Sequence, residues 1–131
     1  MSAGRDDDDV LDVQQLDELR ELAEEIGDPA FLVRLIDQYL EDAASRMAEL
    51  QEATDRRDAP ALVAAAHALK GGSATMGAKG VAALCADLEV AGRRGELPGP
   101  DDLARVSAEL QLAAAALQAQ MPLPDDPGKL S

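Results

Sequence analysis

Residues 59–77 have the sequence APALVAAAHALKGGSATMG and contain the chain's single histidine, His67. Alanine and leucine dominate this stretch, and both are strong helix formers. At about 100° per residue, Leu62, Leu69 and Met76 fall within about 40° of one another, so they predict the core face of a helix. His67 lies roughly 150° from the centre of that face. The stretch therefore predicts a helix whose imidazole points away from the core.

Helical spacing of apolar residues continues on both sides of this stretch. The predicted helices cover about 12–26, 29–56, from 58–60 to 76, 79–94 and 101–120. Pro29 suits the first position of its helix, because a proline lacks the N–H that would be unpaired there. Long helices joined by short loops predict an all-α fold. We expect an antiparallel four-helix bundle formed by the last four helices, with an additional short N-terminal helix covering one end.

The two ends of the chain differ from its helical middle. Residues 1–10 include four consecutive aspartates at 6–9, whose like charges repel; they predict a disordered acidic lead, with an interaction tail as the alternative. Residues 122–131 contain three prolines and a glycine and predict a disordered tail. A chain of 131 residues has the length of one domain, so we place a single bundle domain at 11–121.

The composition excludes several classes of function. A net charge of −14 opposes nucleic-acid binding, and an aromatic content of 2% offers few platforms for base stacking. One cysteine, Cys85, allows neither an intrachain disulfide nor a cysteine-based zinc site, and it falls on the inward face of its helix. No apolar run approaches the roughly 20 residues of a membrane span, and the acidic N-terminus differs from a signal peptide. We expect a cytoplasmic, monomeric protein without membrane association.

The surface around His67 is predicted to be open and basic. Its neighbours on the helix surface are Val63, Ala64, Lys70, Gly71 and Ala74. A glycine inside a helix costs about 1 kcal/mol relative to alanine. Close packing explains Gly72 at the edge of the core, whereas room for a bulky group to reach His67 explains the outward-facing Gly71. Residues 61–95 carry four basic and two acidic side chains, a net charge of +2, so the rest of the chain carries −16. The alternative is a merely exposed histidine beside a chance cluster of charges.

An exposed histidine with nearby cations and no catalytic partner suits a passive acceptor of a phosphoryl group. Neutral imidazole is a nucleophile near pH 7 and forms covalent intermediates. Lys70, three residues further on, can place its ammonium beside the ring and offset the charge of a phosphate. We expect no metal site, because one histidine without clustered carboxylates is a poor ligand set, and no cofactor. An enzyme with its own turnover is also not expected, because no acid–base pair accompanies His67.

The sequence HALKGGSA at residues 67–74, followed by Met76-Gly77-Ala78, closely resembles the signature of histidine-containing phosphotransfer (HPt) domains. The resemblance continues downstream in Leu84-Cys85, Leu88-Glu89 and Arg93-Arg94-Gly95, and upstream in Phe31-Leu32 through Tyr39-Leu40. It covers about residues 11–120.

The resemblance implies a role in a two-component phosphorelay. In this family an exposed histidine takes a phosphoryl group from the aspartyl phosphate of a receiver domain and passes it to another receiver. His67 matches the phosphorylated position, Lys70 the lysine that stabilises the phosphoryl group, and Gly71 the glycine that leaves room for the partner's active site. Glu89 matches a polar residue that holds the other imidazole nitrogen, and Arg93 matches a supporting basic residue. The partner brings Mg²⁺ and an acidic pocket, so no cofactor of the chain's own is implied.

The implied partners are response-regulator receiver domains, a hybrid sensor histidine kinase, or both. We expect the residues beside His67, namely Val63, Ala64 and Ala74, to form the docking surface. Two alternatives stay open: a helical adaptor that binds partners without phosphorylation, and a histidine acceptor that a kinase phosphorylates directly. No kinase ATP-binding segment and no receiver domain is recognisable in the sequence, so both a stand-alone protein and an excised domain are compatible with it.

Overall fold

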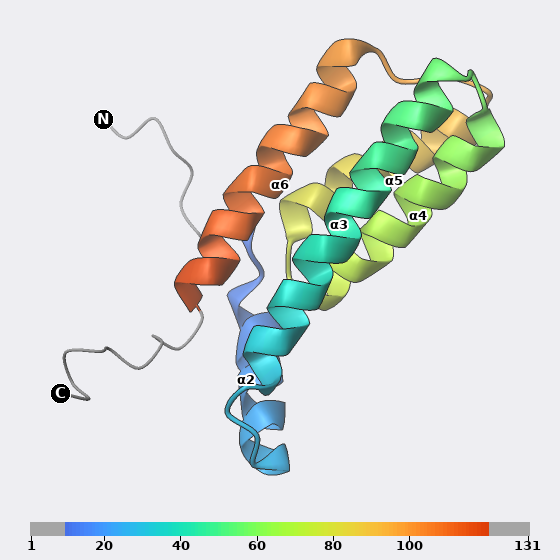
Figure 1. The fold of residues 1–131 in the computed structure, drawn as a ribbon. Coiled ribbons are helices and arrows are strands. Elements are labelled where there is room, and N and C mark those ends of the chain that lie inside the picture. The colour runs from blue at the N-terminus through green and yellow to red at the C-terminus, as the bar shows by residue number, and fades with distance from the viewer. Residues whose placement is uncertain (1–9, 121–131) are drawn as a thin grey trace, which may run out of the picture.

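The computed structural model describes residues 10–120, and five helices lie within them (Figure 1). In chain order they are α2 (Val13–Ile26), α3 (Phe31–Asp55), α4 (Ala59–Thr75), α5 (Lys79–Arg93) and α6 (Pro100–Gln120). The described residues contain no strand, so the predicted all-α class is confirmed. Each predicted helix is present, and each of its ends lies within two residues of the expected position.

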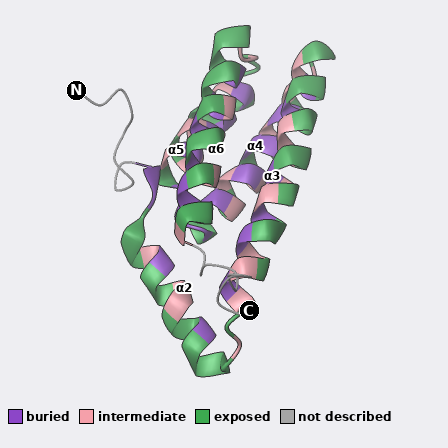
Figure 2. Cartoon of the chain, turned by 60° about the vertical axis from the view of Figure 1, so that its left-hand side comes forward, coloured by how far each residue is buried: buried purple, intermediate pink, exposed green. Residues whose placement is uncertain are grey.

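The helices form a bundle around one apolar core. Helix α4 packs against both α3 and α5, α6 packs against α5 and α3, and α2 contacts α3. The fully buried side chains include Leu16, Ile36, Leu50, Leu62, Val81 and Leu117. Figure 2 shows buried and exposed segments alternating along the helices, as their amphipathic spacing requires. This alternation fixes which face of α4 reaches solvent.

Helix α3 begins two residues later than the sequence predicts. Pro29 does not occupy the first helical position, because residues 28–31 form a turn in which Phe31 N donates to Asp28 O at 3.1 Å. The Asp28 carboxylate also accepts from Ala30 N at 3.0 Å. Proline favours the second position of such a turn, so the same fixed φ that suits a helix start here serves the preceding turn.

The chain is anchored before α2 begins. Val10 and Leu11 are 3% and 1% exposed and belong to the core, so the predicted boundary of the acidic lead at residue 10 is wrong by one residue. Asp12 N donates to Gly77 O at 2.6 Å, and Gln15 Nε2 donates to Thr75 O at 2.9 Å. These bonds hold the start of α2 against the end of α4. Residues 1–9, the rest of the predicted lead, and residues 121–131, the predicted tail with the last residue of the predicted domain, lie outside the described residues.

Two separate features favour a glycine at position 77, just beyond the end of α4. Its φ of +77° belongs to the left-handed region, which favours glycine at a helix end. A Cβ at this position would also lie 2.9 Å from Asp12 O. The stop predicted after Met76 is therefore also the contact point for the N-terminal segment.

None of the helices within residues 10–120 is long and apolar enough to cross a membrane.

Candidate functional site

Helix α4 presents His67 to solvent. The side chain of His67 is 66% exposed, whereas Leu62, Leu69 and Met76 on the opposite face are buried. Beneath this helix, Tyr39 of α3 and Ser73 share a buried hydrogen bond of 2.6 Å. The outward orientation predicted from the helical wheel is confirmed. The packing of α4 on α3 holds the backbone that carries the imidazole in place.

Helix α5 lies very close to α4 because Gly92 has no side chain. A Cβ on Gly92 would lie 2.7 Å from Val63 Cγ2 and 3.3 Å from Leu62 Cδ2. Real Cβ atoms do not approach other carbons at 2.7 Å, so any other residue would push the two helices apart. This close approach brings Glu89, one turn before Gly92, to the histidine. In the sequence, the one signal for Gly92 is that it is a glycine inside a strongly helical segment.

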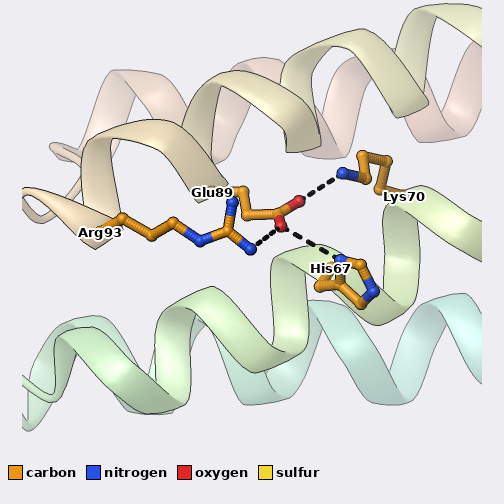
Figure 3. A network of polar contacts seen from close by, with 4 residues as sticks. All are labelled: His67, Lys70, Glu89 and Arg93. Atoms are coloured by element: carbon orange, nitrogen blue, oxygen red, sulfur yellow. Dashed lines mark hydrogen bonds and ion pairs between the residues drawn. The ribbon is translucent and has the colours of Figure 1, made fainter.

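Four side chains meet where these two helices approach (Figure 3). Glu89 Oε2 lies 3.1 Å from His67 Nδ1 and 2.6 Å from an Nη atom of Arg93. Its other oxygen, Oε1, lies 2.6 Å from Lys70 Nζ. The side chain of Glu89 is only 3% exposed, whereas that of Arg93 is 63% exposed. A buried carboxylate therefore stands at the centre of three nitrogen-bearing side chains that reach the surface.

The carboxyl group of Glu89 is held in its ionised form. Its pKa lies below the ordinary value, chiefly because Lys70 hydrogen-bonds to it, with further lowering by His67 and the charge of Arg93, against a raising effect of burial. An ionised carboxylate can only accept hydrogen bonds. Nδ1 of His67 must therefore carry the proton of this contact, which assigns the neutral ring its Nδ1–H tautomer and leaves a lone pair on Nε2. In Figure 3 the second ring nitrogen points away from Glu89.

Lys70 makes a contact that the spacing of residues along α4 does not predict. Its ammonium is paired with Glu89, 2.6 Å away. At neutral pH the cluster formed by His67 and its neighbours contains two cationic side chains, Lys70 and Arg93, and one anionic side chain, Glu89. With a neutral His67, the charge of these four residues is +1, which is a local reversal of the negative charge of the chain.

The two successive glycines after Lys70 face different surroundings. A Cβ on Gly71 would meet no atom within 4 Å, so the surface one turn beyond His67 is open. A Cβ on Gly72 would lie 3.7 Å from the ring of Tyr39, which is ordinary van der Waals contact. Gly72 thus lies at the edge of the core, as expected, but the ring of Tyr39 leaves room for one methyl group at this position.

The three predicted docking residues occupy different parts of the surface. Val63 is half-buried and lines a hollow of about 480 Å³ whose other lining residues include Pro60, Gly92 and Arg93. Ala64 is exposed and lines a separate hollow between α3 and α4, and Ala74 is exposed near the end of α4. Of the three, only Val63 lines a hollow that also includes Arg93, a residue of the polar cluster around His67.

Metal and thiol chemistry are the two alternatives to compare with His67. Within 10–120, no three His, Cys, Asp or Glu side chains cluster as a metal site would require. Cys85 is fully buried in the core, and burial raises the pKa of its thiol to about 12. A thiol in this state does not act as a nucleophile at neutral pH, so His67 is the candidate nucleophile of this region.

Comparison with known proteins identifies the family of the chain. A family model described as the Hpt domain matches residues 34–120. The chain belongs to the Hpt domain family. The Hpt chain is also similar to the crystal structure of histidine-containing phosphotransfer protein B (HptB) from Pseudomonas aeruginosa PAO1. The two are 33% identical, the match covers 85% of this Hpt chain and 93% of that one, and the TM-score is 0.76. No protein of curated function matches the chain.

Proposed function

We propose that His67 is the residue that carries the phosphoryl group when this Hpt domain performs histidine phosphotransfer in a phosphorelay. The observation that carries the proposal is the contact of 3.1 Å between His67 Nδ1 and Glu89 Oε2. Because Nδ1 donates there, Nε2 keeps its lone pair on a side chain that is 66% exposed. Glu89 therefore orients the ring through Nδ1, while Nε2 stays accessible to a partner from the solvent side.

The transfer step follows from that orientation. Nε2 attacks the phosphorus of an aspartyl phosphate on a receiver domain, in line with the bond to the aspartate oxygen. The N–P bond forms as the P–O bond breaks, and the bonding electron pair leaves with the aspartate, which becomes a carboxylate. The ring then carries the phosphoryl group on Nε2, its original proton on Nδ1 and one positive charge. Reversal of the same step on a second receiver restores the neutral ring.

Glu89 suits the role of a positioning residue for this step. The ring gains positive charge during the attack, and the ionised carboxylate already accepts the Nδ1 proton. A fixed charge aimed at a developing charge stabilises the transition state without reorganisation. Lys70 and Arg93 lie within the same cluster, where their cations balance the carboxylate before transfer and are available to the phosphoryl oxygens after it.

Access and docking come from the surface on either side of His67. The open space around Gly71 admits the active site of the partner. The hollow lined by Val63, Gly92 and Arg93 lies one turn from His67 toward the start of α4 and suits an apolar side chain of the receiver. Ala64 and Ala74 extend the docking surface with small side chains. The basic cluster complements the acidic pocket of a receiver and favours productive orientation.

The domain acts as a phosphocarrier, because the phosphoryl group that His67 receives comes from one receiver domain and leaves to another. Helices α3 to α6 form the antiparallel four-helix bundle, and α2 is the additional N-terminal helix. A cytoplasmic monomer meets receiver domains or a hybrid sensor histidine kinase.

The test is labelling by a phosphorylated receiver domain, with the chain compared to its His67→Gln variant. We expect label on the chain and none on the variant, with circular dichroism showing the same helix content for both. Equal labelling would exclude His67 as the acceptor. A histidine acceptor served directly by a kinase would be labelled by kinase and ATP but by no phosphorylated receiver, and an adaptor would be labelled by neither.

A further inference from the structure

A buried hydrogen bond joins α3 to the part of α4 that follows the polar cluster. The phenol of Tyr39 on α3 and the hydroxyl of Ser73 on α4 lie 2.6 Å apart. Tyr39 is 6% exposed, and Ser73 is fully buried. Burial raises the pKa of the Tyr39 phenol to about 12, so the phenol is neutral at pH 7 and either hydroxyl can donate. The proposed transfer step uses neither of these groups.

The bond holds a turn of α4 that has low helix propensity. Gly71 and Gly72 stand between Lys70 and Ser73, and each costs a helix about 1 kcal/mol relative to alanine. Neither glycine has a side chain that could fasten this turn to a neighbouring helix. Ser73 follows them directly, and its hydroxyl bonds to α3. Because a hydrogen bond restricts distance and direction more narrowly than apolar contact does, it sets how this turn lies on α3.

Two contacts with neighbouring helices flank the stretch of α4 that carries His67 and Lys70. Before this stretch, Val63 lies against α5, where Gly92 leaves room for it. After this stretch, Ser73 bonds to α3. Val63 is four residues from His67, whereas Ser73 is three residues from Lys70. The contact with α5 therefore bears most directly on the histidine, and the bond to α3 bears most directly on the lysine.

The thiol of Cys85 indicates how close the bond lies to the polar cluster. Cys85 is fully buried on α5, one turn before Glu89. Burial is the main cause of its raised pKa, and the charges of Glu89 and Lys70 also act on this thiol. Cys85 in turn adds to the raised pKa of Tyr39. The interior beneath Lys70 and Glu89 is therefore continuous with the interior around Tyr39.

We propose that Tyr39 and Ser73 are positioning residues for phosphoryl transfer and that they act through Lys70. This inference rests on the proposed role of His67. With the bond in place, the backbone of Lys70 is held so that its ammonium lies 2.6 Å from Glu89 and close to the site where the phosphoryl group arrives. Without the bond, the turn that contains the two glycines gains freedom, and the ammonium leaves this position more often. A cation that is not held in place stabilises the transition state less.

The first experiment measures labelling of His67 in Ser73→Ala and Tyr39→Phe, which each remove one hydroxyl of the bond. Both variants are expected to react about fivefold more slowly with a saturating phosphorylated receiver and with phosphoramidate, a small phosphoryl donor, because positioning acts on the chemical step. The matched control is Thr54→Val, which removes a hydroxyl that bonds to Leu50 O at 2.7 Å in the last turn of α3. It is expected to react at the wild-type rate. Wild-type rates in Ser73→Ala and Tyr39→Phe would overturn the proposal, and so would slowing with the receiver alone, which would indicate docking.

The second experiment separates positioning from a general loss of stability. Ser73→Ala is measured in the wild-type chain and in Lys70→Ala, as a double-mutant cycle on the rate of labelling by phosphoramidate. If Ser73 acts through Lys70, its substitution is expected to change the rate by less than about twofold once the lysine is absent. The same slowing in both backgrounds would overturn the proposal, since the bond would then act through the fold as a whole. Failure of the proposed role of His67 gives a different result, because His67→Gln would then be labelled as the wild type is.

Discussion

The buried carboxylate of Glu89 lies beneath the exposed imidazole of His67, with Oε2 at 3.1 Å from Nδ1. The two side chains differ widely in exposure, 3% against 66%. The carboxylate is therefore shielded from solvent, whereas the ring nitrogen that is not bonded to it is open to a partner. The pair comes from different helices, so the close approach of α4 and α5 sets the tautomer of the histidine. Since Lys70 and Arg93 hold the same carboxylate, the orientation of the ring depends on three ion-pairing side chains.

The contribution of the Glu89 charge is tested by Glu89→Gln. The amide keeps the shape and can still accept the proton of Nδ1, but it cannot stabilise the positive charge that the ring gains. We expect receiver-to-His67 transfer to slow on the order of tenfold, which corresponds to a modest loss of transition-state stabilisation. Rapid-quench phosphotransfer at saturating receiver measures this rate, because it separates the chemical step from docking. An unchanged rate would reduce Glu89 to a residue that holds Lys70 and Arg93 in place.

The same carboxylate makes the stability of the domain depend on acid. The pKa of Glu89 is lower in the folded chain than in the unfolded one, so its pairing stabilises the fold fully above the ordinary pKa of a glutamate, about 4.3. This stabilisation is lost as the pH falls through the lower folded-state pKa. We expect the wild-type chain to have a higher melting temperature than Glu89→Gln at pH 7. The two melting temperatures are expected to converge toward pH 3. A difference that stays constant over this range would contradict the assignment of an ionised, paired Glu89 to the folded state.

The open surface at Gly71 predicts a different kind of effect. In Gly71→Gln the new side chain extends into space where no atom lies within 4 Å of a Cβ, so folding is expected to be unaffected. Transfer from a receiver is expected to slow by about tenfold or more, because the reacting groups no longer reach their aligned geometry. Phosphoramidate, which needs no protein docking, is expected to label His67 at nearly the wild-type rate. Normal transfer from the receiver would show that the glycine is not needed for access.

The sequence alone predicts the helices and the orientation of His67, because both depend on local spacing. The position of Lys70 could not be predicted from α4, since the partner of its ammonium, Glu89, comes from a different helix. In the sequence, Glu89 and Arg93 resemble an ordinary exposed i,i+4 pair, and only the packing of α5 against α4 shows that the carboxylate is buried. The burial of Val10 cannot be predicted from the sequence for a similar reason: it depends on contacts made through the fold, while the four residues before Val10 are aspartates.

The close approach at Gly92 can be tested by one substitution made at two glycines. Gly71→Ala and Gly92→Ala both gain about 1 kcal/mol of helix propensity. A methyl group at Gly71 meets open space, whereas a methyl group at Gly92 lies 2.7 Å from Val63 Cγ2, and a valine in a helix has little rotamer freedom to move away. We expect Gly92→Ala to be less stable than Gly71→Ala by about 1–3 kcal/mol in urea unfolding, the usual cost of overpacking. Gly92→Ala is also expected to slow phosphotransfer, because a wider gap between α4 and α5 draws Glu89 away from Nδ1. Equal stability of the two variants would mean that α5 can shift without loss, and the fixed distance between His67 and Glu89 would then need another cause.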